Sequence, residues 1–187
     1  RYLKNKANLK QPRNCNKGAM LAKGEYICFL HADDMFLPHN LEKKIQVLRK
    51  NLHIAAVFSG VYLMNADGNI VQELKHEGRP DHNYVGERDD YHDLMKYNYI
   101  PTPSDVLIRK ECFQKLGGFN EKLINGCDWE LWIRLAKEYK LAFIREPLIA
   151  YRMHGANLHT DLRRKNNVVV KDHFWIIDNH LRVNDAN

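Results

Sequence analysis

The sequence predicts an α/β fold in which a mixed β-sheet is flanked by helices. Two observations support this class: short apolar segments alternate with amphipathic helical segments, and one apolar segment ends abruptly in two adjacent acids. The chain has 187 residues and contains no internal repeat or low-complexity linker, which suits one domain. We therefore expect a single domain over residues 1–187, with a motif-bearing core over 1–160 and a helical tail over 161–187.

Five segments are predicted as strands because short runs of apolar, β-branched and aromatic residues fit a buried sheet. They span residues 25–30, 54–64, 70–74, 104–109 and 141–144. Asp67-Gly68 stands between the second and third of these and predicts a hairpin turn. Pro147 is expected to mark the turn after the last strand.

Helices are predicted where apolar residues recur at helical spacing or where capping residues mark an end. We expect one helix closed by Gly24, one starting at Asn40, and others over residues 110–116, 128–139 and 162–181. In the second helix, Leu41, Ile45 and Leu48 form one apolar stripe. Residues 75–93 are polar and charged, which predicts a long surface loop.

Composition and charge exclude several classes of protein. Hydrophobic residues make up 44% of the chain and charged residues 28%, so a disordered chain is not expected. The most apolar run without a charge, residues 54–64, is far shorter than the roughly 20 residues of a membrane span. The four cysteines form no CxxC pattern, which predicts reduced thiols. We expect a cytoplasmic protein and leave peripheral contact with a membrane open.

The net charge of +6 is concentrated at the start of the chain, where residues 1–24 carry seven Lys or Arg and no acid. Such a segment can meet nucleic acid, a membrane surface or a phosphorylated small molecule, or it can be a solvated edge. No recognition motif for nucleic acid accompanies it, so a nucleic-acid partner is not expected.

The segment FLHADD, residues 29–34, is the first candidate site. A strand that ends in Asp33 and Asp34 places two carboxylates at the sheet edge where open α/β folds bind ligands. Adjacent carboxylates repel each other, so a hard divalent cation is a natural partner. The alternative is structural, because Asp34 lies shortly before the helix at Asn40 and could cap it.

The second candidate is Asp128, in the first turn of the helix after Gly126. A carboxylate beside aromatic side chains such as Trp129 and Trp132 can serve as a general base with a pKa tuned by burial. An acid in a first helical turn is also an ordinary cap that offsets the helix dipole. Both interpretations stay open at the level of sequence.

The third candidate is His154, which precedes Gly155 in an apparent loop after a strand. Histidine there can bind a metal, although a single loop histidine is more often only exposed. The chain contains no HExxH pattern, glycine-rich phosphate loop or Ser-His-Asp order. A classical metalloprotease, a P-loop enzyme and a common hydrolase are therefore disfavoured.

Three stretches in series carry a resemblance to a known family. They are NKGAMLAKGEYICFLHADDMFLP, IPTPSDVLIRKECFQKLGGFNEKLINGCDWELWIRLA and PLIAYRMHGANLH. Together, over about residues 10–160, they resemble family-2 glycosyltransferases of the GT-A fold, a Rossmann-like fold of nucleotide-diphospho-sugar transferases. The resemblance implies metal-dependent transfer of a sugar to an acceptor hydroxyl with inversion at the anomeric carbon, in polysaccharide or glycan biosynthesis.

The resemblance also implies roles for individual residues. Asp34 would bind Mn²⁺ or Mg²⁺ in the DXD-type motif, Asp33 would assist with metal or ribose, and His154 would be a further contact to metal or diphosphate. Asp128 would be the catalytic base. The nucleotide-sugar side would comprise Asn16, Lys17, His31 and Asp33, and the acceptor side Trp129 and Glu130. The partners implied are a nucleotide-diphospho-sugar donor and a glycan or lipid-linked acceptor.

Two departures from the family pattern shape the alternative hypothesis. The opening strand–helix–strand of the family is not found, so the domain is expected to be truncated at its N-terminus. His31 stands where the family usually has the first acid of its metal motif. The alternative is therefore a truncated or degenerate glycosyltransferase-like module that binds a nucleotide or a partner without turnover. Dependence of donor binding on Mn²⁺ distinguishes the two hypotheses.

Overall fold

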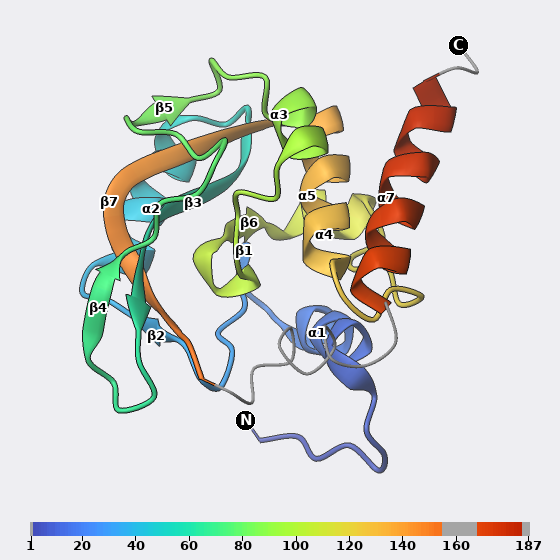
Figure 1. The fold of residues 1–187 in the computed structure, drawn as a ribbon, viewed down its shortest axis with the longest axis horizontal. Coiled ribbons are helices and arrows are strands. Elements are labelled where there is room, and N and C mark those ends of the chain that lie inside the picture. Colours follow the sequence, from blue (N-terminus) through green and yellow to red (C-terminus); the bar gives the residue numbers. More distant parts are fainter. Residues whose placement is uncertain (1, 155–167, 185–187) are drawn as a thin grey trace.

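The computed structural model describes residues 2–154 and 168–184, and these form a curled mixed sheet with helices on both faces (Figure 1). The strands are β1 (Tyr26–Cys28), β2 (Met35–Phe36), β3 (Ile54–Met64), β4 (Ile70–Glu73), β5 (Tyr84–Val85), β6 (Leu107–Arg109) and β7 (Lys140–Arg152). The helices are α1 (Lys10–Leu21), α2 (Asn40–Lys50), α3 (Asp90–Lys96), α4 (Lys110–Lys115), α5 (Cys127–Glu138) and α7 (Val168–Asn184), with a 3-10 turn η1 (Pro103–Asp105).

The sheet has the strand order β1-β6-β3-β7-β2, with β4 paired to β3 and β5 paired to β7. β3 and β7 run parallel over their whole length, and the other pairs are antiparallel. The predicted mixed sheet is therefore confirmed. The hairpin at Asp67-Gly68 is confirmed as well, because Gly68 has a φ of 93° in the turn from β3 to β4.

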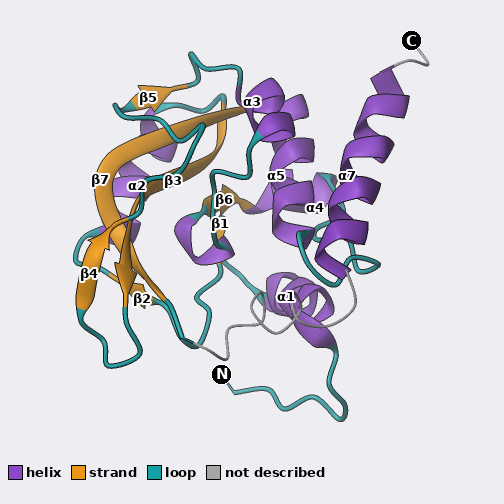
Figure 2. Ribbon diagram, in the orientation of Figure 1, coloured by secondary structure: helices purple, strands orange, loops and turns teal. Residues whose placement is uncertain are grey.

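Two apolar layers cover the two faces of the sheet, since neighbouring residues of a strand point to opposite sides. Val57 and Ala142 belong to a smaller layer with Leu48 of α2. Phe58 and Phe143 belong to a larger one, which includes side chains of α5 and Ile176 of α7. Figure 2 shows α3, α4, α5 and α7 grouped on one side of the strands.

Helix α2 corrects the predicted apolar stripe. Leu48 is fully buried and Ile45 packs against the same layer, but Leu41 is 41% exposed. The buried face passes through Lys44, whose ammonium group donates to the Asp105 backbone oxygen at 2.6 Å. A lysine occupies this helix face because a buried carboxylate receives it, which residue spacing alone does not reveal.

The sequence predicts that the last strand ends before Pro147. Strand β7 instead continues through this proline to Arg152. The proline is tolerated because the pairing with β3 shifts register around Gly60, which lies opposite it. A Cβ at Gly60 would lie 2.5 Å from the Arg145 oxygen and 2.7 Å from the Pro147 nitrogen. A glycine and an irregular ladder thus let one long strand pass a residue that cannot donate a hydrogen bond.

Other boundaries differ less. Ser104 lies in η1, so the strand expected from residue 104 begins at Leu107, and α1 ends at Leu21 with Ala22 as its cap rather than at Gly24. Of the predicted tail helix, α7 is seen from Val168, while residues 162–167 lie outside the described part of the chain. Within residues 2–154 and 168–184, no helix combines the length and apolarity needed to cross a bilayer.

The segment 75–93 is not wholly a surface loop. It contains β5 and the first turn of α3, and it sends the Arg79 side chain into the interior, only 6% exposed. The Arg79 guanidinium donates to the backbone oxygens of Ser59 and Tyr99 and pairs with Asp105 at 3.1 Å. Asp105 also accepts from Ser59 Oγ at 2.7 Å, so one buried carboxylate joins β3, η1, α2 and this segment.

Candidate functional site

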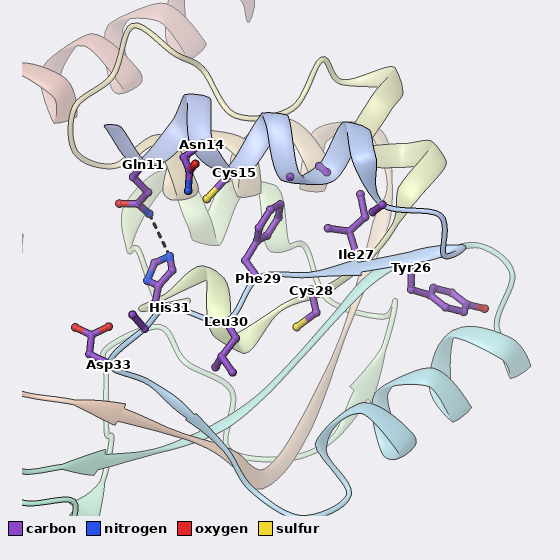
Figure 3. Close-up of a pocket in the computed structure, with 14 residues that line it drawn as sticks. Gln11, Asn14, Cys15, Tyr26, Ile27, Cys28, Phe29, Leu30, His31 and Asp33 are labelled. Atoms are coloured by element: carbon purple, nitrogen blue, oxygen red, sulfur yellow. Dashed lines mark hydrogen bonds between the residues drawn. The ribbon is translucent and has the colours of Figure 1, made fainter. Parts of the chain in front are cut away.

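A cavity of about 770 Å³ lies between α1 and the segment from β1 to Asp33. Figure 3 shows Gln11, Asn14 and Cys15 of α1 facing Phe29 and His31 across it. The ring nitrogen Nε2 of His31 lies 3.4 Å from Gln11 Nε2. The first candidate segment thus leads from an apolar strand into a hollow with polar side chains at one end.

His31, Asp33 and Asp34 each offer a ligand atom, and these atoms lie within 4.8 Å of one another. The chain turns sharply here, since the Asp34 nitrogen donates to the His31 oxygen at 3.2 Å. Two carboxylates and one imidazole are a donor set that suits a divalent cation, and the imidazole favours a first-row transition ion over Mg²⁺. The residues present therefore fit the divalent cation that the sequence resemblance implies.

Asp34 is held by hydroxyl groups from a distant part of the chain. Its Oδ2 accepts hydrogen bonds from Ser104 Oγ at 2.6 Å and Thr102 Oγ1 at 3.0 Å, and its Oδ1 accepts from the Arg152 nitrogen at 3.3 Å. Burial raises the pKa of Asp34, and these hydrogen bonds partly offset the rise. The capping alternative is wrong, because the N-cap residue of α2 is His39, whose side chain makes no capping hydrogen bond, and the Asp34 carboxylate is held by Ser104 and Thr102 instead.

The end of β7 closes onto the same turn. Arg152 Nε donates to the Asp33 backbone oxygen at 2.9 Å, and His154 Nε2 lies 3.2 Å from Asp33 Oδ2. The structure therefore brings His154 to the predicted metal ligands, in contact with one carboxylate. The remainder of the third candidate motif, residues 155–159, lies outside the described residues.

Asp128 lies at the N-terminus of α5, just after Gly126, which has a φ of 72°. Its Oδ1 accepts a hydrogen bond from the Trp129 nitrogen at 2.9 Å, so it contacts a first-turn N–H as the capping alternative expects. Burial raises the pKa of Asp128, while the Trp129 hydrogen bond and the charge of His31 act against the rise. A carboxylate with a raised pKa accepts a proton more readily at neutral pH.

Asp128 and the cation cluster have electrostatic partners in common, namely His31 and Tyr151. His31 acts on both Asp34 and Asp128, lowering the pKa of each. Burial raises the pKa of Tyr151 on β7, and Asp34, Asp33 and Asp128 all add to that rise. Asp34 and Asp128, 94 residues apart in sequence, therefore both lie near enough to Tyr151 for their charges to raise its pKa.

The two predicted nucleotide residues of α1 have other partners. The Asn16 side chain donates to the Phe119 oxygen and accepts from the Phe119 nitrogen, both at 2.9 Å, which fastens α1 to the turn after α4. Lys17 Nζ donates to Asn5 Oδ1 at 2.7 Å. Neither residue lines the cavity beside His31. Their nucleotide-binding roles stay predictions.

Trp129 and Glu130 lie in the interior, 5% and 3% exposed. Trp129 Nε1 donates to the Leu94 oxygen at 2.7 Å, and Glu130 forms a two-point ion pair with Arg134, at 2.7 Å for each contact. Both side chains hold α5 in place. An acceptor contact through them is therefore not supported by their positions, and the acceptor side is left without an assigned residue.

Sequence reasoning missed Thr102 and Ser104, which hold Asp34, and Tyr151, whose pKa the three acids raise. Thr102 and Ser104 stand in the polar run TPSD just before an apolar strand, where hydroxyls at a strand entrance could have been recognised as partners for a carboxylate. The sequence pattern assigned Ser104 to the strand instead, because the 3-10 turn has no hydrophobic period of its own.

Comparison with known proteins gives consistent matches. The family model described as glycosyltransferase like family 2 matches residues 1–176. An uncharacterised glycosyltransferase, MJ1057 of Methanocaldococcus jannaschii, is 33% identical over 156 residues, covering 81% of this chain and 50% of the relative. The amylovoran biosynthesis glycosyltransferase AmsB of Erwinia amylovora is 28% identical over 141 residues, covering 74% of this chain and 45% of the relative. The chain thus spans about half the length of these curated relatives.

Solved structures of S. aureus TarS, residues 1–349, show the same fold. The complex with UDP-GlcNAc matches with a TM-score of 0.59 at 13% identity, covering 81% of this chain and 41% of that one. The complex with UDP matches with a TM-score of 0.58, covering 79% and 41%. At this identity the likeness concerns the fold alone, and it confirms the expected α/β nucleotide-sugar transferase architecture.

Proposed function

The chain belongs to the glycosyltransferase family 2-like family, and we propose that it carries the site that transfers a sugar from a nucleotide-diphosphate sugar to an acceptor hydroxyl. One observation carries the proposal. Asp34 accepts a hydrogen bond from the Arg152 nitrogen and Asp33 contacts His154, while Asp33, Asp34 and Asp128 all raise the pKa of the adjacent Tyr151, so both acidic centres lie near the end of β7.

The chemistry needs two such centres. As the acceptor oxygen bonds to the anomeric carbon, the bond between that carbon and the diphosphate oxygen breaks. The nucleoside diphosphate leaves with the electron pair of that bond. Asp128 accepts the proton that the acceptor hydroxyl loses, a role that its raised pKa favours. Attack from the face opposite the leaving group inverts the anomeric carbon, and separate carboxylate sites suit that arrangement.

His31, Asp33 and Asp34 would hold the divalent cation, with Mn²⁺ preferred to Mg²⁺ because one donor is an imidazole. When bound, such a cation neutralises negative charge on the diphosphate. Ser104 and Thr102 keep the Asp34 carboxylate in place, and His154 contacts Asp33. The ordering of these side chains before the substrate binds reduces the rearrangement needed during the reaction.

The donor and acceptor classes rest on the relatives. TarS has been solved in complex with UDP and with UDP-GlcNAc, which supports a nucleotide-sugar donor here. AmsB is named for amylovoran biosynthesis, which supports a glycan or lipid-linked glycan acceptor. A cytoplasmic location with peripheral contact to a membrane remains a prediction from the same family.

Thermal unfolding tests the donor site. We would measure the melting temperature with UDP, GDP or dTDP, each with and without Mn²⁺. A ligand that binds only the folded state, at 100 times its dissociation constant, stabilises by about 2.7 kcal/mol. We expect one nucleotide to raise the melting temperature only with Mn²⁺, and Asp34→Ala to abolish that dependence.

Turnover distinguishes the proposal from the module that binds without catalysis. The complete protein is assayed for release of the nucleoside diphosphate from the matching sugar donor, with and without a glycan acceptor. Mn²⁺-dependent binding with no turnover on any acceptor would favour the degenerate module. Binding that is indifferent to the metal and to Asp34→Ala would contradict the metal site itself.

A further inference from the structure

Helix α7 packs against the part of the chain that leads into Asp128. Ile176 is fully buried in the main apolar layer, and the His173 ring lies edge-on to Trp129 with centroids 5.0 Å apart. In Figure 1, α7 runs beside α5. The two helices therefore meet at the end of α5 that carries Asp128.

Asp172 makes the polar connection between α7 and this region. Its Oδ2 accepts hydrogen bonds from two successive backbone N–H groups, those of Ile124 at 2.9 Å and Asn125 at 2.7 Å. Hydrogen bonds to a charged acceptor are stronger than neutral ones. One carboxylate oxygen thus fixes two peptide units in the turn that precedes α5.

The turn is also constrained by shape. Gly126 adopts a φ of 72°, and a Cβ there would lie 3.2 Å from Ile176 Cδ1 and 3.6 Å from His173 Cδ2. Its backbone oxygen accepts from the Glu130 nitrogen at 2.9 Å, which begins the hydrogen-bond ladder of α5. The position of Gly126 therefore determines where the first turn of α5, and with it Asp128, lies.

We propose that Asp172 is a positioning residue for Asp128. By holding the N–H groups of Ile124 and Asn125, it sets the start of α5 and the placement of the Asp128 carboxylate opposite the cation cluster. The proposal rests on the proposed function of Asp128 as the base. Helix α7 thus covers the apolar layer and also contributes to the position of the catalytic base.

The test compares Asp172→Ala and Asp172→Asn in the complete protein. Displacing a catalytic group by about 1 Å costs on the order of 100-fold in rate. We expect Asp172→Ala to lower kcat roughly 10- to 100-fold, while the dissociation constant of the nucleotide with Mn²⁺ stays within about twofold of the original. Asp172→Asn, which keeps one acceptor oxygen, should restore part of kcat. Asn179→Ala, at an exposed position on the same helix, is the control and should match the original protein.

A double-variant comparison separates positioning from simple support of the fold. In an Asp128→Asn background, Asp172→Ala should lower the residual turnover by less than about threefold, since its effect passes through Asp128. Equal losses in both backgrounds, or equal losses of kcat and nucleotide affinity, would overturn the proposal. So would full activity of both Asp172 variants. If Asp128→Asn itself keeps full activity, the proposed role of Asp128 as the base is wrong. That outcome differs from the results that would contradict only the positioning role of Asp172.

Discussion

Ser104 Oγ donates a hydrogen bond to Asp34 Oδ2 at 2.6 Å and so joins two residues 70 positions apart. The next residue, Asp105, is fully buried and accepts hydrogen bonds from Lys44, Arg79 and Ser59. The Asp105 carboxylate of η1 is therefore fixed in the interior. Ser104 of η1 and Thr102 just before it hold the Asp34 carboxylate of the candidate metal site. The buried hydrogen-bond network around Asp105 fixes the turn and thereby the Ser104 hydroxyl that holds Asp34.

Ser104→Ala should weaken Mn²⁺-dependent nucleotide binding by roughly 10- to 150-fold, because a hydrogen bond to a charged group contributes roughly 1.5–3 kcal/mol and each 1.4 kcal/mol is about tenfold. The same hydrogen bond lowers the pKa of Asp34, so its loss raises that pKa and moves the acid loss of binding to higher pH. Calorimetric titration at several pH values measures both effects. Ser104→Thr keeps the hydroxyl and should retain the affinity; equal behaviour of the alanine and threonine variants would refute the role.

Lys44→Met should reduce the free energy of unfolding by about 3 kcal/mol, since it removes one partner of a buried ion pair. Lys44 and Asp105 are both 0% exposed, and Arg79 alone would then face the carboxylate. The matched control is Lys43→Met, whose ion pair with Glu146 lies on the surface and should cost less than about 1 kcal/mol. Urea denaturation of the two variants measures the difference, and similar losses would show that the buried network adds nothing.

The pH dependence of kcat/KM should carry an acid limb that belongs to Asp128. Burial raises its pKa above the ordinary value of 3.8, and only the deprotonated form accepts a proton. Activity should therefore fall as the pH drops through this raised pKa, and should be fully present above it. A rate profile at constant ionic strength locates the limb. A profile that stays flat down to pH 4 would exclude Asp128 as the base.

The main strands and helices could be predicted from sequence because their side chains show regular periods. The run from Ile54 to Met64 is a strand as expected, and α5 covers Cys127–Glu138 against an expected 128–139. The path of β7 through Pro147 could not be predicted, since it depends on Gly60 in another strand. Lys44 in a buried helix face depends likewise on a distant partner, Asp105.

The candidate site shows the same division. Asp33, Asp34, Asp128 and His154 were found from short motifs, because a carboxylate after a strand or at a helix start is visible locally. The hydroxyls that hold Asp34 come from Ser104 in η1 and Thr102 just before it, and Tyr151, whose pKa the acids raise, comes from β7, so only the fold connects them. The sequence predicts that Trp129 contacts the acceptor, yet in the structure it is buried, with Leu94 of α3 and His173 of α7 as contacts.

We propose that Asp128 performs the proton transfer in a site whose donor half is formed around Asp34. The most direct test measures turnover and nucleotide affinity side by side for Asp128→Asn, which keeps the size of the side chain. A general base typically contributes 10²–10⁴-fold, so we predict a loss of that order in kcat with nucleotide affinity in the presence of Mn²⁺ changed by less than about twofold. Unchanged turnover, or a loss of affinity as large as the loss of turnover, would contradict the account.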